Sequence, residues 1–192
     1  MANVMDLRGK IREANLGDLE SLKQLDDACF EYPWSKPDFA EALGSRGAQV
    51  VLVVEHEKRL IAYAVYVRLP KRAMCQILRM GVLAEFRRKR VASQLMASIR
   101  QELDARTTFR VCAQDNDLIS HQFLKTNGLT CSQILPKYYR FADNTTGDAY
   151  EFVFGGAAFK PKPRVYPNAG RLEVNLKNRF GNRKGFTEDD CV

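Results

Sequence analysis

Apolar and polar positions along the chain change repeatedly between helical and strand spacing. In residues 17–30, GDLESLKQLDDACF, apolar residues recur at intervals of three and four, which predicts a helix. EYPW interrupts this pattern. Ser35 is then a suitable N-cap for a short helix over residues 36–44, with Pro37 in its first turn.

Strand patterns follow in the middle of the chain. Residues 50–56, VVLVVEH, form a continuous β-branched run, and residues 60–67 are expected to return as its antiparallel partner. The later segments alternate between the two spacings. We expect strands at 75–83, 109–113, 129–141 and 148–154, and helices at 90–105 and 118–128. This order predicts a mixed α/β domain over residues 1–154.

Composition agrees with this fold class and distinguishes the last residues from the rest of the chain. The chain has 192 residues, 45% of them apolar, which suits one globular domain. Residues 155–192 carry eight Lys/Arg and four Asp/Glu, show little periodicity, and are expected to form a basic, irregular extension. An acidic or RNA-containing partner is one hypothesis for this tail. No segment has the pattern of a membrane span or a signal peptide, so we expect a cytoplasmic protein that does not bind a membrane.

The cysteines and histidines do not have the spacing of a metal site. Five cysteines occur without a CxxC pair, and His56 and His121 are the only histidines. We therefore expect no metal. The first four cysteines lie in apolar or periodic segments, which predicts reduced, buried thiols.

A basic segment stands between the strand at 75–83 and the following helix. In VLAEFRRKRVASQLM, residues 82–96, four consecutive cations precede the helical pattern. Because a helix N-terminus already carries positive potential, these charges repel one another unless an anion binds there. A diphosphate would offset the repulsion, with bidentate contacts from Arg87 and Arg88.

Three other interpretations of the basic segment remain open. These interpretations are a solvated charge cluster, a nucleic-acid contact and a nucleotide-binding loop. A nucleic-acid site usually has further basic or aromatic surface in line. A nucleotide-binding loop is disfavoured, because its glycines and its Lys-Ser/Thr pair are missing.

GVLAEFRRKRVASQLM resembles the acyl-CoA pyrophosphate motif of the GNAT N-acetyltransferases, a strand ending in Val followed by Gln/Arg-x-x-Gly-x-Gly/Ala. CFEYPWSKPDF and KYYRF resemble the acceptor loop and the tyrosine-containing hairpin of the subgroup that acetylates protein N-termini, including the ribosomal-protein alanine acetyltransferases. The resemblance covers about residues 11–154. It implies the GNAT acyl-CoA N-acyltransferase fold, with a central, mostly antiparallel sheet flanked by helices.

The resemblance also implies a set of site residues. Those expected to bind acetyl-CoA as co-substrate are Met80, Gly81, Val82, Arg87, Arg88, Lys89, Arg90, Val91, Ala92, Ser93 and Asn116. Those expected to line the acceptor groove are Tyr32, Pro33, Trp34, Tyr138 and Tyr139. Asn116 or the neighbouring Asp117 is equally suited to be the N-cap of the helix at 118–128. Trp34 and one tyrosine are equally well explained as core aromatics.

The motif departs from the family at one binding position. Arg90 stands where a glycine usually lets the backbone approach the phosphate, and an arginine fits there if its φ is negative.

The usual acid and base are also missing. The tyrosine acid corresponds to Leu124, and the usual base positions fall at Val111 or Cys112 and at Gln76. Tyr139 is a candidate replacement acid and Cys112 a candidate base, although Cys112 is better explained as a core residue. His121, one turn before Leu124, is expected at the surface.

Without a strong acid or base, the reaction favours an acceptor amine that is already partly unprotonated at neutral pH. An α-amine has a pKa near 8, against about 10.4 for lysine. We therefore expect an acetyl-CoA-dependent N-acetyltransferase whose acceptor is a protein or peptide N-terminal α-amine. The alternatives are a non-catalytic acyl-CoA-binding or interaction module and an enzyme that acetylates small-molecule amines.

Overall fold

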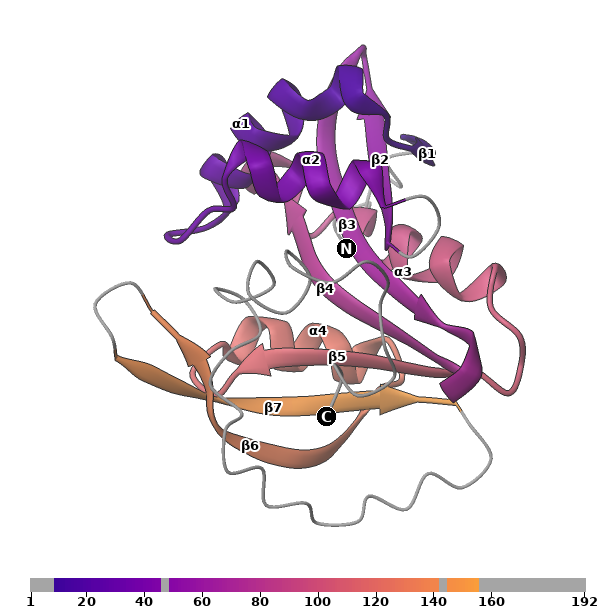
Figure 1. Ribbon diagram of the computed structural model, residues 1–192, viewed down its shortest axis with the longest axis vertical. Helices are drawn as coiled ribbons and strands as arrows, with labels where there is room; N and C mark the ends of the chain where they lie inside the picture. The colour runs from indigo at the N-terminus through magenta and orange to yellow at the C-terminus, as the bar shows by residue number, and fades with distance from the viewer. Residues whose placement is uncertain (1–8, 46–48, 142–144, 156–192) are drawn as a thin grey trace, which may run out of the picture. The chain divides into compact units, whose positions relative to one another are not determined.

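The computed structural model describes residues 9–45, 49–141 and 145–155 (Figure 1). Its chain divides into two compact units, one comprising the residues up to Arg110 together with Gly155, and the other residues 111–154. The tail predicted at 155–192 lies outside the described residues apart from Gly155. In the described ranges, no helix is long and apolar enough to cross a membrane.

The first unit is an antiparallel sheet with three helices. Its elements are β1 (Lys10–Glu13), η1 (Leu16–Asp18), α1 (Leu19–Cys29), α2 (Lys36–Gly44), β2 (Gln49–His56), β3 (Arg59–Leu69), η2 (Pro70–Arg72), β4 (Met74–Val82), η3 (Ala84–Phe86), α3 (Val91–Gln101) and the start of β5 (Thr108–Gln114). The antiparallel order is β1-β2-β3-β4, which confirms the expected pairing of residues 50–56 with 60–67. The sequence did not reveal β1, which is short and has no apolar pattern.

Helices cover both faces of β3. All residues from Leu60 to Val67 are buried, as is typical of a strand enclosed on two sides. The Tyr63 ring packs edge-on against Phe39 of α2. Tyr66 points to the opposite face by strand alternation and donates its hydroxyl to Glu102, just after α3.

The pairing of β3 with β4 shifts by one residue at Leu78. Val65 lies opposite Arg79, whereas Tyr66 lies opposite Ile77, so Leu78 has no partner on β3. A one-residue insertion of this kind is a β-bulge, which changes the face on which the following side chains lie. Arg79 therefore lies on the same face as Val65 and Tyr63.

The second unit contains the end of β5, α4 (Leu118–Thr126), β6 (Thr130–Arg140) and β7 (Thr146–Phe154). Its strand order is β5-β7-β6, and β6 and β7 form an antiparallel hairpin. Pro136 lies where the hairpin register shifts, the kind of position at which a strand tolerates proline. Asp117 caps α4 by accepting a hydrogen bond from the Ser120 backbone N–H.

Two local predictions fail because of tertiary packing. His121 was expected at the surface, but it is only 6% exposed and packs against Tyr150 and Phe152. Cys131 was expected to be buried, but it is exposed on β6, while Cys29 and Cys112 are half-buried. Cys75 is buried as expected, and burial raises the pKa of its thiol to about 12.

Strand β1 is held by a small ionic network around Arg12. The Arg12 guanidinium donates two 2.8 Å hydrogen bonds to the Asp18 carboxylate and one of 3.1 Å to Glu55. The bond from Arg12 lowers the pKa of Asp18 below its ordinary value of 3.8. A carboxyl whose pKa is depressed in the folded state adds stability above its unfolded pKa and loses it as the pH falls.

We predict that Asp18→Asn lowers the free energy of unfolding by about 1 kcal/mol at pH 7. The deficit should shrink below about pH 4 and disappear near pH 2, because both proteins then lack the ionised carboxylate. Urea unfolding at a series of pH values measures this. Asp27→Asn, which removes only the exposed pair with Lys23, should change stability by less than about 0.5 kcal/mol. A deficit of Asp18→Asn that persisted unchanged at pH 2 would contradict the ionic explanation.

Candidate functional site

The basic turn between β4 and α3, residues 87–90, has an unusual backbone. Arg88 and Arg90 have φ of 64° and 61°, in the left-handed region. Arg90 therefore does not meet the condition of a negative φ under which an arginine fits the glycine position without strain. A left-handed conformation costs a residue other than glycine about 1–2 kcal/mol, and such strain clusters at functional sites.

The side chains of this turn leave the first turn of α3 uncapped. Arg90 is the N-cap of α3 but makes no side-chain capping bond, so within the described part of the chain its side chain leaves the first N–H groups of α3 to other acceptors. Arg87, Arg88 and Arg90 are exposed, and the Lys89 ammonium lies 5.3 Å from the centre of the Phe86 ring. Free N–H groups with nearby guanidiniums are suited to bind an anion.

Val82 presents its backbone at the edge of β4 away from β3. Leu83 donates a hydrogen bond to the Ile61 carbonyl, so the neighbouring Ala62–Val82 pair is a non-hydrogen-bonded pair of the ladder. The N–H and C=O of Val82 consequently point away from β3. The Arg87 side chain donates from Nε to the Val82 oxygen at 3.0 Å. Arg87 thus links the basic turn to the end of β4.

The loop between α1 and α2, residues 30–35, carries the three predicted acceptor residues of the first unit in different environments. Tyr32 is 51% exposed, and Pro33 is also exposed. Trp34 is 6% exposed and packs on Phe39. The Trp34 indole N–H has no hydrogen-bond partner among the described residues. The structure therefore exposes Tyr32 and Pro33 as possible contacts and places the Trp34 ring in the core.

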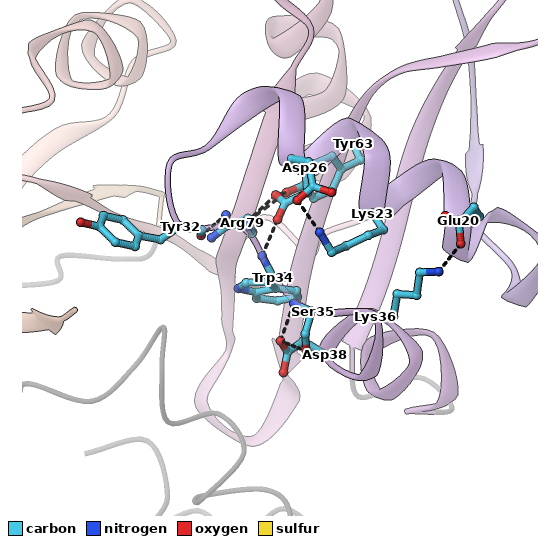
Figure 2. Close-up of polar contacts among 11 residues, drawn as sticks. Glu20, Lys23, Asp26, Tyr32, Trp34, Ser35, Lys36, Asp38, Tyr63 and Arg79 are labelled. Carbon is cyan, nitrogen blue, oxygen red and sulfur yellow. Dashed lines mark hydrogen bonds and ion pairs between the residues drawn. The ribbon is translucent and has the colours of Figure 1, made fainter. Parts of the chain in front are cut away.

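A buried polar network lies against this loop (Figure 2). Asp26 of α1 accepts hydrogen bonds from Arg79 Nε at 2.7 Å, from the Trp34 backbone N–H at 2.6 Å, and from the Tyr63 hydroxyl. Burial raises the pKa of Tyr63 well above its ordinary value, so the phenol stays protonated. The sequence analysis did not single out Asp26 or Arg79. Their signal is a charged residue on an otherwise apolar helix face and another inside an apolar strand.

The predicted residues of the second unit cluster at its hairpin. Tyr138 and Tyr139 are both 4% exposed, with ring centres 5.0 Å apart. Tyr139 donates its hydroxyl to the Cys112 carbonyl at 3.1 Å. Cys112 is partly buried against this tyrosine cluster. Tyr139 and Cys112 are thus in contact, but through the Cys112 backbone.

Two positions at which the resemblance places the acid and a base lie in the interior. Leu124 and Gln76 are buried. Asn116 is exposed in the turn before α4, and Asp117, not Asn116, is the N-cap of that helix. The binding role of Asn116 stays a prediction.

Comparisons with known proteins concern the family and the fold. The sequence profile of the acetyltransferase (GNAT) family matches residues 19–129. No curated protein matches the chain in sequence.

Similar solved structures share the fold at low sequence identity. The ribosomal-protein-S18-alanine N-acetyltransferase from Escherichia coli aligns with a TM-score of 0.68 at 16% identity, over 83% of this chain and 99% of that one. Arabidopsis thaliana NAA60 with a bisubstrate analogue aligns with a TM-score of 0.67 at 18% identity, over 77% and 98%, and NAA60 has also been solved with acetyl-CoA. Ard1 from Thermoplasma volcanium aligns with a TM-score of 0.64 at 20% identity, over 79% and 100%.

We predict that Arg90→Gly raises the free energy of unfolding by about 0.5 kcal/mol, because relief of left-handed strain exceeds the added entropy of the unfolded chain. Arg87→Gly is the matched control, since Arg87 is an extended residue with φ of −66°. This control should lower stability by about 0.5–1 kcal/mol. Urea unfolding of both variants measures the difference, and a loss of stability in Arg90→Gly would contradict strain at this position.

Proposed function

The chain belongs to the GNAT acetyltransferase family, and from this premise we propose that it transfers the acetyl group of acetyl-CoA to a protein or peptide N-terminal α-amine. The observation that carries the proposal is the basic turn, where two left-handed arginines precede an uncapped helix. Strain and charge repulsion at one turn are both unfavourable in isolation. A bound diphosphate compensates for both.

The residues present fit acetyl-CoA. Backbone N–H groups and side chains from Arg88 to Ser93 would hold the pyrophosphate, and Arg87 would add a guanidinium beside them. Met80, Gly81 and Val82 would bind the pantetheine arm, because the Val82 N–H and C=O point away from β3. The C=O now accepts the Arg87 Nε hydrogen bond, which the arm would replace or share. When bound, acetyl-CoA supplies the activated thioester.

The Val82 N–H is the group suited to polarise the thioester carbonyl. The amine nitrogen forms the new C–N bond as the C–S bond breaks, and the amine proton must leave to solvent or to the departing sulfur. Placement of the two reactants can by itself remove several kcal/mol of the barrier, about 7 or more in well-oriented cases. The enzyme can therefore work without a strong base if the acceptor arrives neutral.

The chemistry favours an α-amine over a lysine side chain. With a pKa near 8, roughly a tenth of the α-amine is neutral at pH 7, against less than a thousandth of a lysine with a pKa near 10.4. Tyr139 is the phenol available as a proton donor. Because its proton now bonds to the Cys112 carbonyl, it would have to turn from that carbonyl to reach a thiolate.

We predict that acetyl-CoA binds in isothermal titration calorimetry and that Arg87→Glu/Arg88→Glu weakens binding at least about tenfold, because two charge-assisted contacts become repulsive. Lys10→Glu/Lys36→Glu is the matched control, since it makes the same change in net charge at two exposed lysines on β1 and α2, outside the basic turn. Binding that is equal in the two double variants would refute the cofactor assignment.

We also predict that kcat/KM for a peptide with a free N-terminus rises with pH and levels off near the acceptor pKa of about 8. A thiol-release assay between pH 6 and 9.5 measures this. The same peptide with an acetylated N-terminus and an internal lysine is the control acceptor, and it should react far more slowly. Faster acetyl transfer to that control or to small amines would contradict the proposal that the acceptor is a peptide N-terminal α-amine. Tight acetyl-CoA binding without turnover on any amine would instead support a non-catalytic binding module.

A further inference from the structure

Arg79 and Asp26 form an ion pair inside the first unit, against the loop of residues 30–35. Their side chains are 3% and 0% exposed, so water does not screen the two charges. Asp26 lies in the last turn of α1, and its carboxylate also receives the Trp34 N–H. The negative partner is therefore bonded to both the strand and the loop.

The Arg79 guanidinium also contacts three residues of the same loop. Nη2 donates to the Tyr32 carbonyl at 2.9 Å. The guanidinium carbon lies 3.9 Å from the centre of the Phe30 ring and 5.6 Å from that of Trp34. Alternate residues of the loop thus touch one side chain. Figure 2 shows the Tyr32 ring pointing away from this network, so its backbone is held while its ring is presented outward.

Gly81, two residues along β4 from Arg79, provides the space for this arrangement. A Cβ at Gly81 would lie 2.8 Å from the Tyr63 ring and 3.2 Å from both Cys29 Sγ and the Phe30 ring. These distances are too short for an ordinary side-chain contact. The absence of a side chain at Gly81 therefore lets the end of α1 and the loop lie close to β4.

A buried ion pair is weak evidence for a stabilising role, because well-packed apolar residues often replace such a pair without loss of stability. Its advantage over apolar packing is geometric. A guanidinium fixes several acceptors and rings at once, which neither an apolar side chain nor a lysine can do. The number of loop contacts made by Arg79 points to such a geometric role.

We propose that Arg79 is a positioning residue for the acceptor, which holds the loop so that Tyr32 and Pro33 contact an incoming peptide N-terminus. This inference rests on the proposed function. Because Asp26 compensates the guanidinium charge, Arg79 does not repel the cationic form of the acceptor amine. A peptide long enough to touch Tyr32 and Pro33 benefits from the fixed loop, whereas a small amine does not reach it.

The test compares three variants in steady-state kinetics. Arg79→Lys keeps the charge but loses the fork and the ring stacking. Asp26→Leu/Arg79→Met removes both charges and keeps an apolar interior. Arg68→Lys is the matched control, an arginine on β3 that pairs with Glu102 away from the loop.

Both Arg79 variants should raise the peptide KM at least about tenfold, equivalent to about 1.4 kcal/mol. The KM for acetyl-CoA and the kcat should stay within about twofold of wild type. Hydrogen exchange of the Trp34 amide should be at least about tenfold faster in Arg79→Lys, because the loop opens more often. The control should match wild type in all of these measurements.

The outcomes separate this inference from the proposed function. If the wild type acetylates no peptide, the proposed function fails whatever the variants do. If it acetylates peptides and an Arg79 variant that folds keeps an unchanged peptide KM, only the positioning role fails. Equal losses in kcat and in affinity for acetyl-CoA, or failure of both variants to fold, would show a general structural role and overturn the inference.

Discussion

The ion pair between Asp26 and Arg79 joins three parts of the first unit that are distant in sequence. It connects the last turn of α1 to the middle of β4, and through Tyr63 it includes β3. Removing one partner would leave an uncompensated charge in a site from which water is excluded, which typically costs about 3–5 kcal/mol. The position of the loop of residues 30–35 follows from this pair, because both of its members bond to the loop backbone.

Strand β4 therefore contacts both the loop proposed to bind the acceptor and the turn proposed to bind the coenzyme. Arg79 and Gly81 face α1 and seat the loop, while Val82 ends the strand and offers its backbone at the opposite edge from β3. The basic turn begins five residues later, and Arg87 reaches back to the Val82 carbonyl. The loop proposed for the acceptor and the turn proposed for the coenzyme thus both contact β4, so the backbone of one strand contributes to the spacing between them.

Local features of the fold were predictable from the sequence. The helix over residues 36–44 was expected with the bounds that the structure shows, because Ser35 as N-cap and Pro37 in the first turn mark its start. The GNAT assignment followed from three motifs in order, of which the basic turn is the most informative. Each of these signals is contained within 16 or fewer consecutive residues of the chain.

The sequence could not supply the features that depend on distant partners. β1 is held by pairing with β2 and by the ionic contacts of Arg12, which no local pattern shows. His121 is buried because a strand some thirty residues later covers it. The left-handed φ of Arg90 departs from the rule that residues other than glycine have a negative φ. Departures of this kind are common where strain accompanies function. The sequence places the charged residues Asp26 and Arg79 at otherwise apolar positions, but it does not show that they contact each other.

The unpaired residue Leu78 decides on which side of the sheet the guanidinium is placed. Ile77 shares a face with Tyr66, yet Arg79, two residues later, shares a face with Tyr63. In a regular strand these two side chains would point the same way, and the cation would then be directed toward the α3 side and away from Asp26. A single inserted residue in one strand thus sets the charge pattern of both faces of the sheet, and deletion of Leu78 would direct the guanidinium away from the loop of residues 30–35.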